Sequence, residues 1–282
     1  MCAPGTIEAV RERFEEDDSF VRIDRRKALL AGAGAAVAAA FPGRALAAPA
    51  KGAAGRAQDL THVFAESLPL FADIFPRPTR DTFVTVPNDG FYGQVWRFWE
   101  HTGTHLDVPA HFIQNGRTTP ELTLDELMSP LAVIDISRRA ASNPDTVVTV
   151  SDLRAYERGH GRIKRGSVVA MNSGWDARAG SEAAYRNADA AGVSHFPGFS
   201  GDAVEWLIEE REIAGIGVDT LSLDPGNATA FVAHLTLLGA NRFGIENLAN
   251  LGRIPAKGTT AFVGVIPWEE GSGGPARVIA TW

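Results

Sequence analysis

Three histidines and one aspartate lie within eleven residues, in the segment HTGTHLDVPAH. They are His101, His105, Asp107 and His111. Neutral imidazole and carboxylate groups are ligands that suit Zn, Mn or Fe(II), and a site with three protein ligands leaves one position for water. A single histidine would be read as a surface or core residue, but four such side chains in one short segment predict a metal site.

A second pair of candidate ligands lies far downstream, with His234 in FVAHLTLLGAN and Glu246 in RFGIENL. Taken singly, a histidine beside apolar residues is usually a core residue, and a glutamate is usually solvated. If the fold brings this pair to the first cluster, Asp107 could bridge two metal ions about 3.5 to 4 Å apart. His101 and His105 would then bind one ion, and His234 and Glu246 the other.

The residues between the first ligands predict a turn that leaves a strand at 94–100. Gly103 permits a tight backbone turn, and Pro109 would interrupt a helix. Elsewhere, β-rich runs alternate with helix-like stretches, which predicts an α/β domain with a mixed sheet that holds the turn in place. The other expected strands are 82–86, 131–136, 167–171, 213–218 and 260–266, and helices are expected at 123–127 and 200–210.

Composition limits the chemistry further. The net charge of −7 comes without a basic run, so nucleic acid is not expected as a partner. The single cysteine, Cys2, excludes an internal disulfide and a thiolate metal cage. The sequence has no G-x-S-x-G motif, so an activated serine is not expected and water activated by a metal is the predicted nucleophile.

The N-terminal segment has the pattern of an export signal. Arg25 and Arg26 precede an apolar stretch of 13 residues at 28–40, which is shorter than the roughly 20 residues needed to span a bilayer. Ala45-Leu46-Ala47 then matches an A-x-A cleavage site. We therefore predict a twin-arginine-type signal at 1–47, a flexible linker at 48–58 and the metal hydrolase domain at 59–282. The alternative is a tail that stays on a cytoplasmic protein.

The pattern H-x-G-T-H-x-D-x-P-x-H resembles the signature of the cyclase family of metal-dependent hydrolases, which includes bacterial kynurenine formamidases (arylformamidases) and isatin hydrolases. Further similarity lies at 59–62, 196–200 and 217–224, so the resemblance covers the chain from about Asp59 to the C-terminus. It implies a swivelling β/α/β fold, usually in homodimers, with one or two Zn or Mn ions. It also implies that His101, His105 and Asp107 bind metal, that His234 and Glu246 complete a second site, and that His111 is catalytic.

The predicted reaction is hydrolysis of an amide or lactam bond, with N-formylkynurenine or isatin as the type of small-molecule substrate. Trp175, His195 and Phe196 are the expected substrate contacts, because Trp175 and Phe196 occur in glycine-containing loops. The aromatic residues at 96–99 are expected to be core, His62 structural and His160 exposed. Two alternatives stay open, namely a polyketide-type cyclase or dehydratase and a non-catalytic exported metal-binding module.

Overall fold

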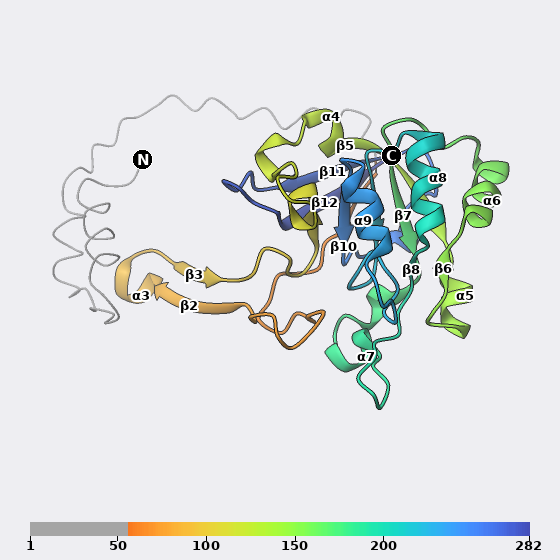
Figure 1. Cartoon of the computed structure of the whole chain (residues 1–282). Helices are drawn as coiled ribbons and strands as arrows, with labels where there is room; N and C mark the ends of the chain where they lie inside the picture. The colour runs from red at the N-terminus through yellow and green to blue at the C-terminus, as the bar shows by residue number, and fades with distance from the viewer. Residues whose placement is uncertain (1–55) are drawn as a thin grey trace, which may run out of the picture. The chain divides into compact units, whose positions relative to one another are not determined.

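The computed structural model describes residues 56–282 (Figure 1). The predicted export signal at 1–47 and most of the predicted linker lie outside the described residues. The described residues are divided between two compact units of the chain. Residues 79–97 form the described part of one unit, and residues 56–78 and 98–282 belong to the other. Within the described range, no helix is both long enough and apolar enough to cross a membrane.

Residues 79–97 form a β-hairpin with a short helix at its tip. Strands β2 (Thr79–Val84) and β3 (Gly93–Arg97) pair antiparallel, and α3 (Val86–Asp89) joins them. Strand β2 ends before the predicted residue 86 because Pro87 stands in the first turn of α3, a position that suits proline's fixed φ. Strand β3 ends at Arg97, not at 100, so it does not run into the ligand segment.

The larger unit is built on a mixed sheet of eight strands, which confirms the predicted fold class. Strands β5, β7, β9 and β10 are parallel neighbours, whereas β11, β12 and β4 pair antiparallel. An additional pairing of β12 with β4 closes seven of these strands into a barrel-like ring. The strands are β1 (Ala57–Asp59), β4 (His105–Asp107), β5 (Met128–Asp135), β7 (Val168–Asn172), β9 (Gly215–Val218), β10 (Phe243–Glu246), β11 (Thr259–Val265) and β12 (Gly273–Thr281).

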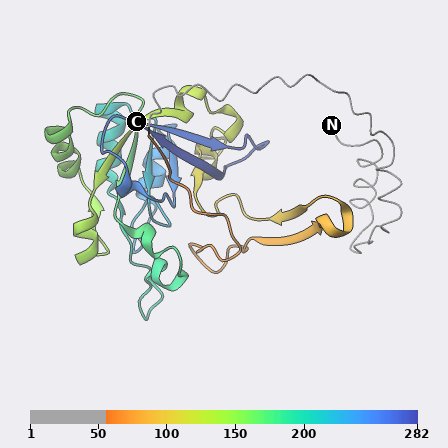
Figure 2. The same ribbon diagram turned by 180° about the vertical axis from the view of Figure 1, so that it is seen from behind.

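Alternation along the strands divides the core between the two faces of the ring. Leu131 and Val133 of β5 pack in a cluster that draws on β4, β7, β10, β11 and β12, and so fill the inside of the ring. Ala132 and Ile134 of the same strand belong to a second cluster on the outer face. That face is covered by α6 (Val150–His160), α8 (Gly201–Arg211) and α9 (Val232–Gly239), as Figures 1 and 2 show.

Helix α8 confirms its predicted amphipathic pattern. The Ser200 hydroxyl accepts a hydrogen bond from the amide of Ala203, as expected of an N-cap. Val204 and Leu207 are fully buried against the sheet, whereas Glu205 is exposed. The predicted capping box at Thr123 is likewise present and begins α4 (Leu124–Leu127).

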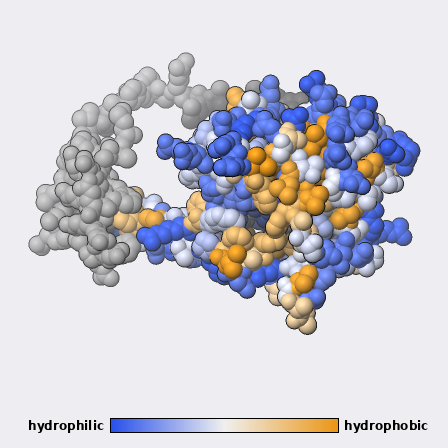
Figure 3. Space-filling model, viewed as in Figure 1, coloured by the Kyte–Doolittle hydropathy of each residue, from blue (hydrophilic) through white to orange (hydrophobic). Residues whose placement is uncertain are grey.

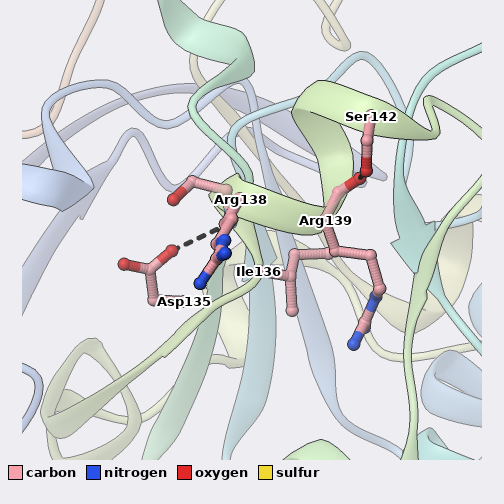
Figure 4. A pocket seen from close by; sticks show the side chains of 6 residues that line it. Asp135, Ile136, Arg138, Arg139 and Ser142 are labelled. Carbon is pink, nitrogen blue, oxygen red and sulfur yellow. Dashed lines mark hydrogen bonds between the residues drawn. The ribbon is translucent and has the colours of Figure 1, made fainter.

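Shorter elements connect these layers. One parallel pair, β6 (Val147–Val148) with β8 (Gly198–Phe199), lies outside the main sheet. The others are α5 (Ser137–Ser142), α7 (Glu182–Arg186), and the 3-10 turns η1 (Pro109–His111), η2 (Thr119–Glu121), η3 (Trp175–Arg178) and η4 (Leu251–Arg253). A cavity of about 530 Å³ lies at the start of α5, where Asp135 accepts a hydrogen bond from the Ser137 amide, and it contains none of the predicted ligands (Figure 4).

Candidate metal-dependent active site

Strand β4 places His105 and Asp107 on one face of the sheet. Their side chains share this face because strand residues alternate, and Leu106 between them points into the core. Strand β10 pairs with β4 in a register that sets Glu246 opposite His105. Cross-strand neighbours have adjacent side chains, and Nε2 of His105 lies 3.4 Å from Oε2 of Glu246. One of the two distant predicted ligands therefore reaches the cluster through strand pairing.

The predicted turn at the ligand segment is only partly right. His105–Asp107 is a strand, because β10 pairs with it on one side and β12 on the other. The turn is confined to the residues before β4, where Gly103 has φ +67°, a conformation that suits glycine. A Cβ at Gly103 would also come within 2.9 Å of Leu68. The strand, and not a turn, therefore sets the directions of His105 and Asp107.

Helix α9 supplies His234 from its first turn. The carboxylate of Asp224 accepts hydrogen bonds from the Ala233 amide at 2.7 Å and from the His234 amide at 3.2 Å. The same carboxylate lies 2.6 Å from Nδ1 of His234, so Nδ1 donates to it and Nε2 is directed at the other side chains of the cluster. That nitrogen lies 3.1 Å from Oε1 of Glu246 and 3.6 Å from Oδ2 of Asp107. Sequence reasoning assigned Asp224 no role, although its place ten residues before His234 is a usable signal.

His101 and His111 complete the cluster. Nδ1 of His101 lies 2.6 Å from Oδ1 of Asp107. The rings of His101 and His111 are stacked, with centroids 3.6 Å apart and an interplanar angle of 22°. His111 is the last residue of η1, which begins at Pro109, and it is half-buried. The fold thus gathers His111 and all five predicted ligands at one place.

The ligand atoms fall into two groups that could each hold a metal ion. One group is His101, Asp107 and His111, and the other is His105, Asp107 and Glu246, with ligand atoms within 4.8 Å of one another in each. Asp107 belongs to both, as a bridging ligand would. The groups follow the stacking of His111 on His101 and the pairing of β4 with β10, and the predicted division of the ligands between two ions stays a prediction. The roles of the individual residues stay predictions.

The donor atoms fit a divalent cation. Asp107 is buried, yet no donor within the described residues reaches its Oδ2 at hydrogen-bond distance. An unpaired buried carboxylate oxygen is costly unless a cation faces it. His105 donates from Nδ1 to the carbonyl of Gly103, at 2.8 Å, which directs its Nε2 at Asp107 and Glu246. Nitrogen and carboxylate oxygen together make a ligand set of the type that Zn and Mn bind.

Electrostatics support the same conclusion. Burial by itself would lower the pKa of His105, but Asp107 and Glu246 outweigh burial and raise this pKa to about 9. Carboxylates that attract a proton to this imidazole would equally attract a metal ion. The pKa of His111 moves the other way, to about 4, chiefly because the ring is buried. His111 is therefore a neutral imidazole near pH 7, able to accept a proton or to offer a lone pair.

Each of the three residues expected to contact substrate has contacts within the protein. Trp175 and Phe196 are almost completely buried and pack with Tyr185 and Leu221, so their rings have no face open to a ligand. His195 pairs with Asp145, its Nδ1 lying 2.7 Å from Oδ1. The burial of the two aromatic rings favours a packing role. That these residues contact a substrate stays a prediction.

Three other aromatic side chains lie beside His101 and His234. The Trp99 ring lies 4.9 Å from that of His101, and Phe112 stacks on His234 at 4.8 Å. Phe231 lies 5.6 Å from His234 and is 39% exposed. Sequence reasoning assigned Trp99 to the core and did not consider the two phenylalanines. Their positions in the sequence, one directly after the ligand segment and one three residues before His234, are the signals that could have identified them.

Known proteins of similar sequence indicate the family of this chain. The Cyclase family model, described as "Putative cyclase", matches residues 58–225. An isatin hydrolase of Roseibium aggregatum is 37% identical over 222 residues, which cover 75% of this chain and 84% of that protein. A kynurenine formamidase of Salinibacter ruber is 31% identical over 155 residues, covering 55% of this chain and 62% of that protein. The chain belongs to the cyclase family of metal-dependent hydrolases.

Solved structures support the same assignment. The crystal structure of an isatin hydrolase bound to the product analogue thioisatinate has a TM-score of 0.76 and 35% identity, over 80% of this chain and 92% of that one. Isatin hydrolase A from Ralstonia solanacearum has a TM-score of 0.75 and 34% identity, over 80% and 91% of the two chains. The protein is thus a metal-dependent hydrolase that acts on C–N bonds of amides or lactams.

Proposed function

We propose that this enzyme opens an isatin-type aromatic lactam, with N-formylkynurenine as a related amide substrate. The observation that carries the proposal is the set of partly exposed aromatic side chains beside the ligand cluster, namely Trp99, Phe112 and Phe231. Aromatic rings bind a planar aromatic substrate by stacking or edge contacts. A lactam held by these rings would have its C–N bond close to the cluster.

His101, His105, Asp107, His234 and Glu246 would hold one or two divalent ions, which we propose to be Zn or Mn. When bound, such an ion supplies a Lewis acid that polarises the substrate carbonyl and lowers the pKa of water to about 7. We assign the proton transfer to His111. Its neutral ring accepts the proton of the attacking water and delivers it to the leaving nitrogen, a task that suits imidazole.

Removal of metal is expected to abolish hydrolysis of isatin and of N-formylkynurenine. After treatment with a chelator, activity followed by absorbance should return with Zn or Mn, and the ion that restores it is the working one. The product should weigh one water more than the substrate, which separates hydrolysis from cyclisation or dehydration. Full activity in metal-free protein would contradict the proposal, and activity on only one of the two compounds would identify the substrate class.

We propose that the protein is exported through its N-terminal segment, which Arg25 and Arg26 mark as a twin-arginine-type signal. Conservative replacement of both by lysine keeps the charge and is expected to retain most of the protein in the cytoplasm. Cell fractionation followed by immunoblotting measures the distribution. An unchanged distribution for the double variant would indicate an ordinary tail.

We also propose a homodimer. Val232 and Leu235 on α9 are about half exposed, and apolar residues gather on the face of the molecule seen in Figure 3. An exposed apolar patch is a typical interface feature. Light scattering of the full-length chain should give twice its mass of 30.1 kDa, and a mass of one chain would exclude the dimer.

A further inference from the structure

The ring of His101 packs against the beginning of strand β12. Nε2 of His101 lies 2.9 Å from the hydroxyl oxygen of Ser272, the residue directly before this strand. A Cβ added at the next residue, Gly273, would come within 2.6 Å of Cε1 of His101. Only a glycine permits so close an approach, so the segment that carries Ser272 packs directly against the imidazole.

The direction of the hydrogen bonds at Ser272 follows from its second partner, Glu100. The hydroxyl lies 2.6 Å from Oε2 of Glu100, and the Ser272 amide lies 3.3 Å from the same oxygen. A carboxylate only accepts hydrogen bonds, so the hydroxyl gives its single proton to Glu100. The serine oxygen then offers only lone pairs to His101. Nε2 of His101 must therefore be the donor in the third bond.

This order of bonds determines which nitrogen of His101 is free. A neutral imidazole carries one N–H, and if that hydrogen lies on Nε2, the lone pair lies on Nδ1. Nδ1 is the atom 2.6 Å from Oδ1 of Asp107, so in a neutral His101 the lone pair of this nitrogen faces the carboxylate oxygen inside the cluster. Such a pair is stable when a cation lies beside it.

We propose that Glu100 and Ser272 are positioning residues that hold His101 as an Nδ1 metal ligand. The inference rests on the proposed metal-dependent function. It also explains a difference within the cluster, because His105 and His234 are fixed in the opposite way. Each of them is bonded through Nδ1, to the Gly103 carbonyl and to Asp224, and so directs Nε2 at the site.

The first test is the metal affinity of Ser272→Ala, measured by competition with a chelating dye. We expect the affinity to fall about 10- to 100-fold, the usual loss when a partner of a ligand is removed. Ser272→Thr keeps the hydroxyl and should restore most of the affinity. Ser142→Ala is the matched control, since the Ser142 hydroxyl donates to the carbonyl of Arg139, outside the cluster.

The second test is a double-mutant cycle with Glu100→Ala, a change at a half-exposed residue. If Glu100 acts through Ser272, the double variant should bind metal about as weakly as Ser272→Ala alone, because both changes break the same chain. Additive losses would overturn the proposed order of bonds. Long-range 1H–15N spectra of the Zn-loaded chain should show His101 protonated at Nε2, and protonation at Nδ1 would contradict the assignment.

Controls separate the possible failures. Thermal melting of the metal-free variants should match that of the metal-free wild type, which shows that they fold. If the wild type binds no metal, the proposed function fails. If the wild type binds metal and Ser272→Ala binds it equally well, the inference about Glu100 and Ser272 is wrong and the proposed function stands.

Discussion

Replacing Asp107 with asparagine is expected to remove bound metal and activity together. Asp107 belongs to both candidate ligand groups, and its carboxylate lies near His101, His105 and His234. Asparagine keeps the size of the side chain but not the negative charge that a cation needs. Loss of several kcal/mol of Lewis-acid stabilisation corresponds to a fall in kcat/KM of about a thousandfold or more. Elemental analysis of the purified protein and steady-state kinetics measure the two effects.

The matched control is Asp202→Asn, the same change at an exposed position on α8. It should keep both metal content and activity. A metal-loaded Asp107→Asn protein with ordinary activity would exclude Asp107 as an essential ligand. Far-ultraviolet circular dichroism shows whether the variant is folded, which separates lost metal from lost structure.

His111→Ala is expected to keep the metal and lose most of the turnover. General acid–base catalysis by a positioned side chain contributes about 10² to 10⁴ in rate, so kcat should fall within that range. The KM should change less, because His111 acts on the proton in the transition state. Stopped-flow or steady-state assays with isatin give kcat, and elemental analysis gives the metal content.

His111 also lies in one of the candidate ligand groups, so this variant distinguishes its two possible roles. Loss of metal in His111→Ala would identify a ligand and contradict the catalytic assignment. His160→Ala is the control, because His160 is an exposed histidine at the end of α6. Its activity and metal content should match those of the wild type.

The candidate ligands could be predicted because their signal is local. His101, His105, Asp107 and His111 lie within eleven residues, and imidazole and carboxylate groups at that density are typical of metal sites. The chemistry of the site therefore follows from residue types and their spacing. The contacts between these side chains did not follow, since they depend on the ring stacking of His101 with His111 and on the pairing of Glu246 with His105.

The fold was predictable where one strand or helix carries a strong pattern. Helix α8 and strands β5, β7 and β11 lie close to their predicted positions, because a cap or an apolar run marks each of them. Strand β12 was not predicted, since it contains Gly273, Gly274 and Pro275. Those residues are unfavourable for a strand, and here they permit close approach to β4 and His101.

The burial of Trp175 and Phe196 could not be predicted from their neighbours in the sequence. Glycine-containing loops made Trp175 and Phe196 look accessible, yet both rings pack into the core with Tyr185. Burial is a property of the assembled layers, and no local pattern reports it. Phe112 and Phe231, which do lie beside His234, come from separate elements that only the fold brings together.

By itself, the amino-acid sequence determined the candidate donor set, the α/β class and the prediction of metal-dependent chemistry, because each depends on residue type and short-range order. Only the tertiary structure decided how the ligands are held. Asp224 orients His234, and Ser272 reaches His101 from 171 residues away. Such contacts arise from strand register and ring closure, which are set by packing over the whole sheet. The orientation of each candidate ligand histidine is therefore a property of the fold.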